Sequence, residues 1–97
     1  MPKAYIVVCY REVRDPAALA KYANIAGPVI AAMGGRPIAR GGQVISLEGG
    51  IDERTNILEF DSVEAAQSFY NCDDYQAALA VLGDAVDRDM RITEALE

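Results

Sequence analysis

The chain has 97 residues, of which 52% are hydrophobic and 25% are charged, and its net charge is −6. This length is that of one domain, so we expect residues 1–97 to form a single domain, and the composition is typical of a globular chain rather than a disordered one. An acidic surface without a run of Lys or Arg repels phosphate groups, so we expect neither nucleic acid nor a membrane surface as a partner.

Residues suited to metal binding are scarce. The chain has no His, and its two cysteines, Cys9 and Cys72, lie far apart with no metal-binding spacing. We therefore expect no metal, no haem and no other cofactor. The apolar run after residues 1–3 is too short for the core of a signal peptide, and no stretch has the length of a membrane span. These features predict a cytoplasmic protein with reduced thiols.

The first third of the chain predicts a strand followed by a helix. Residues 4–10 are mostly β-branched and aromatic, which favours a strand. Asp15-Pro16 predicts a helix start, because a carboxylate can cap the helix and Pro suits its first position. Apolar residues then recur at helical spacing, Pro28 is expected to bend the helix, and Gly34-Gly35 predicts its end.

The middle of the chain predicts a hairpin. Residues 36–47 predict an extended segment with a bulge or bend at Gly41-Gly42. Residues 48–53 predict a turn, and residues 54–60 predict the next strand. These two strands should pair with each other.

A second helical region follows the hairpin. Asp61 and Glu64 have the spacing of a capping box, which predicts that Asp61 caps this helix. The capping residues within 71–74 predict a break, and a short helical piece then ends at Gly83.

Residues 87–95 predict a last strand, with Met90 and Ile92 on its apolar side. The resulting order is β-α-β-β-α-β. This order predicts an α+β, ferredoxin-like fold, in which one antiparallel sheet carries both helices on one face.

The first strand also predicts a dimer. Two helices cover only one face of a four-stranded sheet, yet Tyr5, Val7 and Cys9 make the second face of this strand apolar as well. An exposed apolar patch usually marks an interface, and a second copy would cover it with two-fold symmetry. We therefore expect a homodimer through the sheet face. The alternative is that a loop or the C-terminal tail covers these side chains.

Several short motifs occur in an order and spacing that are specific when taken together. They are Asp15-Pro16 with Tyr22, Gly34-Gly35-Arg36, Arg40-Gly41-Gly42, Leu47-Glu48-Gly49, Leu58-Glu59-Phe60-Asp61-Ser62, Glu64-Ala65-Ala66, Phe69-Tyr70-Asn71 and Tyr75-Gln76-Ala77-Ala78. In these motifs nearly the whole chain resembles the domain-of-unknown-function family numbered thirteen-thirty, within the dimeric α/β-barrel superfamily. The resemblance implies a ferredoxin-like fold and a homodimer, and it implies no established activity.

The chain departs from that family at one place. Family members often carry an Arg near the end of the helical piece that follows Tyr-Gln-Ala-Ala, whereas this chain reads Val81-Leu82-Gly83-Asp84. If that Arg binds a ligand anion in the relatives, a ligand shared with them does not follow from the resemblance.

Glu59 is the candidate catalytic residue. It lies between Leu58 and Phe60 and therefore points to the opposite face of the strand, toward the barrel side. A buried carboxylate there would have a raised pKa and could act as a general base. The alternative is a structural ion pair with Arg40 or Arg54 on the neighbouring strand.

Three further residues complete the expected ligand site. Arg40, beside Gly41-Gly42, could hold a carboxylate or enolate, and Tyr22 and Tyr70 could line a pocket between the sheet and the helices. The alternatives are a simple bulge and ordinary core packing. With Glu59, these residues suggest a homodimer that binds a small organic molecule. The other hypotheses are a cofactor-independent isomerase or monooxygenase-like enzyme acting on a small carbonyl or phenolic compound, as in some superfamily relatives, and a structural dimer without a ligand.

Overall fold

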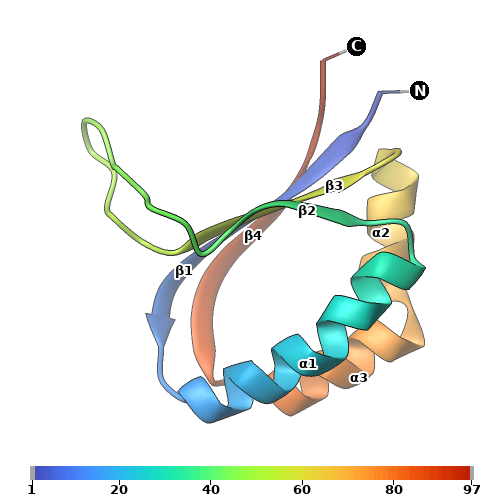
Figure 1. The fold of residues 1–97 in the computed structure, drawn as a ribbon, viewed down its shortest axis with the longest axis horizontal. Helices are drawn as coiled ribbons and strands as arrows, with labels where there is room; N and C mark the ends of the chain where they lie inside the picture. Colours follow the sequence, from blue (N-terminus) through green and yellow to red (C-terminus); the bar gives the residue numbers. More distant parts are fainter. Residues whose placement is uncertain (1, 97) are drawn as a thin grey trace.

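The computed structural model describes residues 2–96 as a four-stranded antiparallel sheet with helices on one face (Figure 1). The elements along the chain are β1 (Ala4–Val13), α1 (Pro16–Ala32), β2 (Arg36–Arg40), β3 (Thr55–Phe60), α2 (Val63–Asn71), α3 (Asp73–Leu82) and β4 (Val86–Glu94). The strands are ordered β2-β3-β1-β4 in the sheet, and all neighbours are antiparallel. With α2 and α3 as two halves of the second helical unit, this is the predicted α+β, ferredoxin-like fold.

The ends of α1 are those that the sequence predicts. Asp15 Oδ1 accepts a hydrogen bond from the Ala18 backbone N–H at 3.1 Å, and Pro16 occupies the first turn. Gly34, with a φ of +85°, follows the helix in the left-handed conformation that glycine adopts without strain. The helix continues through Pro28. No helix within residues 2–96 has the length and apolar character that a membrane span requires.

The hairpin differs from its prediction. β2 ends at Arg40 instead of continuing to residue 47, and its pairing is irregular between Pro37 and Ala39. The predicted bend at Gly41-Gly42 is present at Gly41. Gly41, with a φ of +69°, turns the chain out of the sheet, and its N–H donates to Asn56 Oδ1 at 3.1 Å. This side-chain bond replaces the next step of the ladder, so the strand stops.

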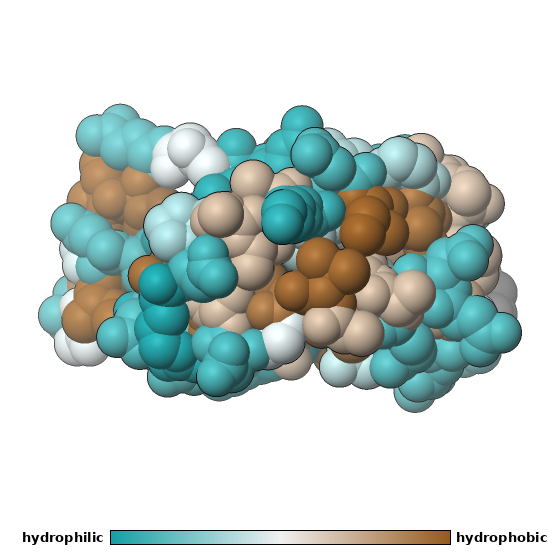
Figure 2. Space-filling view, turned by 90° about the horizontal axis from the view of Figure 1, so that it is seen from below, coloured by the Kyte–Doolittle hydropathy of each residue, from teal (hydrophilic) through white to brown (hydrophobic). Residues whose placement is uncertain are grey.

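Residues 41–54 therefore form a long loop, which we call the arm. Figure 1 shows the arm projecting on the side of the sheet that carries no helix. Its side chains Ile45, Leu47 and Ile51 are exposed, and apolar surface is visible at the left of Figure 2, where the arm lies. An exposed aliphatic group of this kind usually marks a contact surface.

The start of α2 corrects a second prediction. Ser62, not Asp61, caps this helix, because Ser62 Oγ accepts a hydrogen bond from the Ala65 N–H at 3.0 Å. Asp61 instead accepts a hydrogen bond from Arg36 Nη2 at 3.0 Å. The predicted break is present at Cys72, and Gly83, with a φ of +55°, ends α3 as expected.

The core lies between the sheet and the helices. Ala4, Ile6, Val8 and Tyr10 alternate along β1 and are buried, while the residues between them face the open side of the sheet. An aromatic trio joins β3 to α2 and α3, since Phe69 lies 5.2 Å from Phe60 and 4.4 Å from Tyr75 between ring centroids. All three rings are fully buried.

Gly35 is the glycine with the least room for a side chain. A Cβ there would lie 2.6 Å from a ring carbon of Phe60 and 2.8 Å from Ile30 Cγ2. Because Phe60 is fully buried, we expect Gly35→Ala to lower the free energy of unfolding by about 1–3 kcal/mol. Gly42→Ala is the control, since a Cβ at Gly42 meets no atom within 4 Å. Urea unfolding of both variants checks this, and equal midpoints would contradict it.

Candidate functional site

A cavity of about 330 Å³ lies between α1 and the helix-facing side of the sheet. The α1 wall includes four small residues, Ala20, Ala23, Ala26 and Gly27, which leave space beside the larger Leu19, Tyr22 and Ile30. The sheet contributes Val8, Leu58 and Met90. This size and an apolar lining are typical of sites for small organic molecules.

A cluster of one guanidinium and three phenols provides the polar part of the lining. Arg88 Nη1 donates to the hydroxyl oxygens of Tyr10 at 3.2 Å and Tyr22 at 3.4 Å, and Nη2 donates to Tyr75 at 3.3 Å. The Tyr22 and Tyr75 hydroxyls share a hydrogen bond of 2.6 Å. Arg88 also lies over the rings of Tyr10 and Tyr22, with Cζ 5.7 Å and 5.1 Å from their centroids.

The surroundings of Tyr75 and Arg88 keep the phenol of Tyr75 neutral and the guanidinium of Arg88 charged. Burial, together with the charge and the hydrogen bond of Tyr22, raises the pKa of Tyr75 well above its ordinary value. Burial acts to lower the pKa of Arg88, but the phenol oxygens, Tyr22 foremost, outweigh burial and raise it. At neutral pH the cluster therefore presents the half-buried positive charge of Arg88 beside the neutral phenol of Tyr75.

Two more arginines lie at the same cavity. Arg40 pairs with Asn56 across β2 and β3, so the sheet directs both toward the helix side, and both line the cavity. Arg54 also lines it and places Cζ 5.5 Å from the ring centroid of Tyr10. The cavity thus combines an apolar body with three guanidinium groups.

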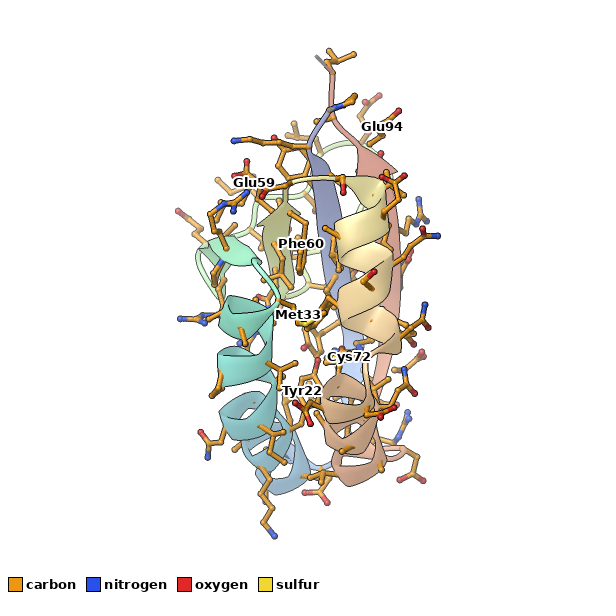
Figure 3. The ribbon with its side chains drawn as sticks, turned by 90° about the vertical axis from the view of Figure 1, so that its right-hand side faces the viewer. Tyr22, Met33, Glu59, Phe60, Cys72 and Glu94 are labelled. Carbon is orange, nitrogen blue, oxygen red and sulfur yellow. The ribbon has the colours of Figure 1, made fainter. Side chains whose placement is uncertain are left out.

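The four residues predicted to share a site are divided by the structure. Tyr22 and Arg40 line the same cavity. Tyr70 does not; it is 38% exposed, its ring centroid lies 5.5 Å from that of Tyr75, and it lines a second hollow beside Ile6 of β1 and Met90 of β4. Glu59 lies on the opposite face of the sheet, paired with Tyr5 of β1. In Figure 3, Tyr22 points into the space between α1 and α3, and Glu59 lies toward the other end of the molecule.

Glu59 forms an ion pair, the alternative to a general base that the sequence left open, but with other partners than expected. Its Oε1 accepts hydrogen bonds from Arg36 at 3.1 Å and from Lys3 at 3.4 Å, rather than from Arg40 or Arg54. The hydrogen bond from Arg36 is the main cause of a lowered pKa, whereas a general base at this position would need a raised one. Burial opposes this shift but does not outweigh the two cations.

These contacts predict how Glu59→Gln changes stability with pH. Because the folded pKa lies below the ordinary value of 4.5, the ion pairs stabilise the fold above that pH, and the contribution disappears as pH falls through the folded pKa. We expect the variant to be less stable than the wild type at pH 7 and equally stable near pH 2. Urea unfolding at both pH values measures this, and a difference that persists at pH 2 would contradict the account.

Strand alternation in the sequence indicates that Arg88 faces the helices, although its hydropathy alone suggests a solvated residue. Arg88 is two residues before Met90, so strand alternation places both on the helix-facing side of β4, where Arg88 pairs with Tyr10 and Met90 with Val8. Tyr75 stands on the apolar side of its helical segment. Arg88 and Tyr75 are 13 residues apart in the sequence and are brought together by the tertiary structure, so no local pattern predicts their contact.

The fold and the cavity together define a small ferredoxin-like α+β protein with a pocket between sheet and helices. The chain matches the family described as "Domain of unknown function (DUF1330)" over residues 3–96, and it belongs to that family. No curated protein matches the chain.

Solved structures share this fold. A protein of unknown function from Rhodopseudomonas palustris is 22% identical, with a TM-score of 0.77 over 99% of this chain and 84% of that one. A dimeric ferredoxin-like protein of unknown function from Thermobifida fusca is 15% identical, with a TM-score of 0.63 over 97% and 92% of the two chains. SnoaB, a cofactor-independent oxygenase from Streptomyces nogalater, is 11% identical, with a TM-score of 0.66 over 100% and 96%.

Proposed function

We propose that this chain forms a homodimer through the open face of its sheet and binds a small organic molecule in the cavity between α1 and the sheet. The observation that carries the proposal is the cavity itself, an apolar space with Arg88 and its three phenols in one wall. A charged side chain that is half buried beside an empty apolar space favours a ligand over a purely structural role.

The homodimer has support from the surface of the sheet. Tyr5, Val7 and Cys9 are only half-buried in the single chain, and Ile57 lies beside Val7 on the same face. The arm projects on this side, with its exposed aliphatic side chains (Figure 1). The Thermobifida fusca protein with the same fold is described as dimeric. A second copy would cover both apolar surfaces at once.

A cofactor-independent enzyme remains the second candidate, because the positive cluster would also stabilise the oxygen of an enolate. SnoaB is an oxygenase of this kind on the same fold. A binding protein releases its ligand unchanged, whereas an enzyme converts it. Recovery of a bound compound in unchanged form therefore supports the proposal of a binding protein over that of an enzyme.

The proposal predicts that a two-ring aromatic acid stabilises the protein. We expect 1-naphthoate to raise the midpoint of thermal unfolding as its concentration increases, because a ligand that binds only the folded state shifts the equilibrium toward it. Ala23→Trp, which places a large ring at the cavity wall, should abolish the shift. Ala31→Trp is the control, since Ala31 is exposed on α1 and does not line the cavity. An equal shift in both variants would overturn the site.

A further inference from the structure

The arginines of this chain fall into two groups. Arg11, Arg14, Arg36 and Arg91 each lie within 4.0 Å of a carboxylate oxygen. Arg40, Arg54 and Arg88 form no such pair within residues 2–96, and all three line the cavity. In a chain with 15 acidic residues and 9 basic ones, three guanidinium groups without a carboxylate partner among the described residues therefore lie at one cavity. Arg40 and Arg54 are exposed, whereas Arg88 is half-buried. Because a charge that leaves water is normally paired, Arg88 is the group of the three that favours an anionic ligand.

Arg88 is the innermost of these charges. It has five N–H donors, and three hydrogen bonds to phenols use only part of them. The phenols hold the guanidinium in place but do not neutralise it. A planar, fixed guanidinium is suited to a carboxylate, which it can bind through two parallel hydrogen bonds.

The lining also limits what the cavity can do to its ligand. Within residues 2–96, no carboxylate, thiol or amine side chain lines the cavity, and the chain contains no imidazole. The phenol of Tyr75 is a poor base at neutral pH, because burial raises its pKa. Among the described residues, the wall therefore offers no carboxylate, thiol, amine or imidazole to take a proton from a weakly acidic ligand, so a ligand that forms an ion pair with Arg88 must arrive as an anion.

We infer that the cavity selects organic carboxylates that arrive already ionised, with the carboxylate held by Arg88 and an apolar body lying along the small residues of α1. Arg40 and Arg54 add positive charge at the same cavity, which attracts anions to an otherwise acidic protein. This inference rests on the proposed function, and it adds the chemical class of the ligand.

The test compares 1-naphthoate with 1-naphthamide by isothermal titration calorimetry on the full chain. The two probes have nearly the same shape, but only the first is charged. We expect the wild type to bind the carboxylate about ten- to a hundred-fold more tightly, the range that hydrogen bonds to a charged group typically supply. Arg88→Met should remove most of this preference while binding of the amide is retained. Lys21→Met, which removes a positive charge from α1 outside the cavity, should preserve it.

The outcomes separate the two levels of the account. Equal affinity of the wild type for both probes would overturn the inference and leave the proposed function standing. A preference for the carboxylate that survives in Arg88→Met would also overturn it. Failure of both probes to bind, or binding that Ala23→Trp does not weaken, would overturn the proposed function itself. The comparison on the wild type needs no variant, so it decides the inference even if Arg88→Met does not fold.

Discussion

Val7→Asp is expected to convert the proposed homodimer into a monomer. Val7 is half-buried at the middle of the open sheet face, between Ile57 of β3 and Arg91 of β4. Arg91 already pairs with Asp89 at 2.9 Å, so the new carboxylate finds no free partner there. Burying one unpaired ion costs several kcal/mol, and two-fold symmetry places two of them in the interface.

Light scattering at micromolar concentration measures this effect. The wild type should have the mass of two chains and Val7→Asp the mass of one. Val81→Asp is the matched control, because Val81 lies 41% exposed on α3, away from the sheet face. If Val7→Asp fails to fold, Val7→Thr takes its place, because it keeps the shape of the side chain and adds one hydroxyl. We expect Val7→Thr to weaken the dimer without unfolding the chain. A wild type with the mass of one chain would contradict the proposed assembly.

Phe69→Ala is expected to remove a large part of the stability of the fold. Its ring is fully buried and connects Phe60 of β3 with Tyr75 of α3. Replacing a buried Phe by Ala typically costs 3–5 kcal/mol, and a small domain has only about 5–15 kcal/mol in total. The same change would widen the cavity that Phe69 lines.

Tyr70→Ala is the matched control for this prediction. Tyr70 is the next residue on α2 and is also aromatic, but it is 38% exposed. We expect its loss of stability to be less than half that of Phe69→Ala. Urea unfolding at one fixed protein concentration measures both, because association would otherwise change the midpoint. Equal losses would show that the aromatic trio is not the centre of the core.

Much of the fold followed from local sequence patterns. The Asp15-Pro16 start of α1, the glycines that end α1 and α3, and the alternation of Leu58 and Phe60 with Glu59 all reflect interactions between near neighbours. The end of β2 did not follow, because it depends on a bond from Gly41 to Asn56, 15 residues away. Ile45 and Leu47 look like strand residues, but within residues 2–96 no strand pairs with them.

The site was predicted only in part, for a similar reason. Helical spacing and the hairpin place Tyr22 and Arg40 between the helices and the sheet, and both line the cavity. For Glu59 the alternation gave the right face of the sheet, and the alternative of an ion pair is what the structure shows. Its partners Lys3 and Arg36 were not foreseen, because they come from distant parts of the chain. Arg88 was overlooked, since a charged residue in a strand is usually solvated. Its burial arises from three phenols on different elements.

The most direct test of the central claim is a crystal structure of the full chain soaked with 4-iodobenzoate, with the iodine located by its anomalous scattering. The account predicts iodine between α1 and the sheet, next to the small residues of α1, and a carboxylate within hydrogen-bond distance of Arg88. The account would be contradicted if the iodine were bound only outside the cavity, for example on the open sheet face near Arg36 or Arg91.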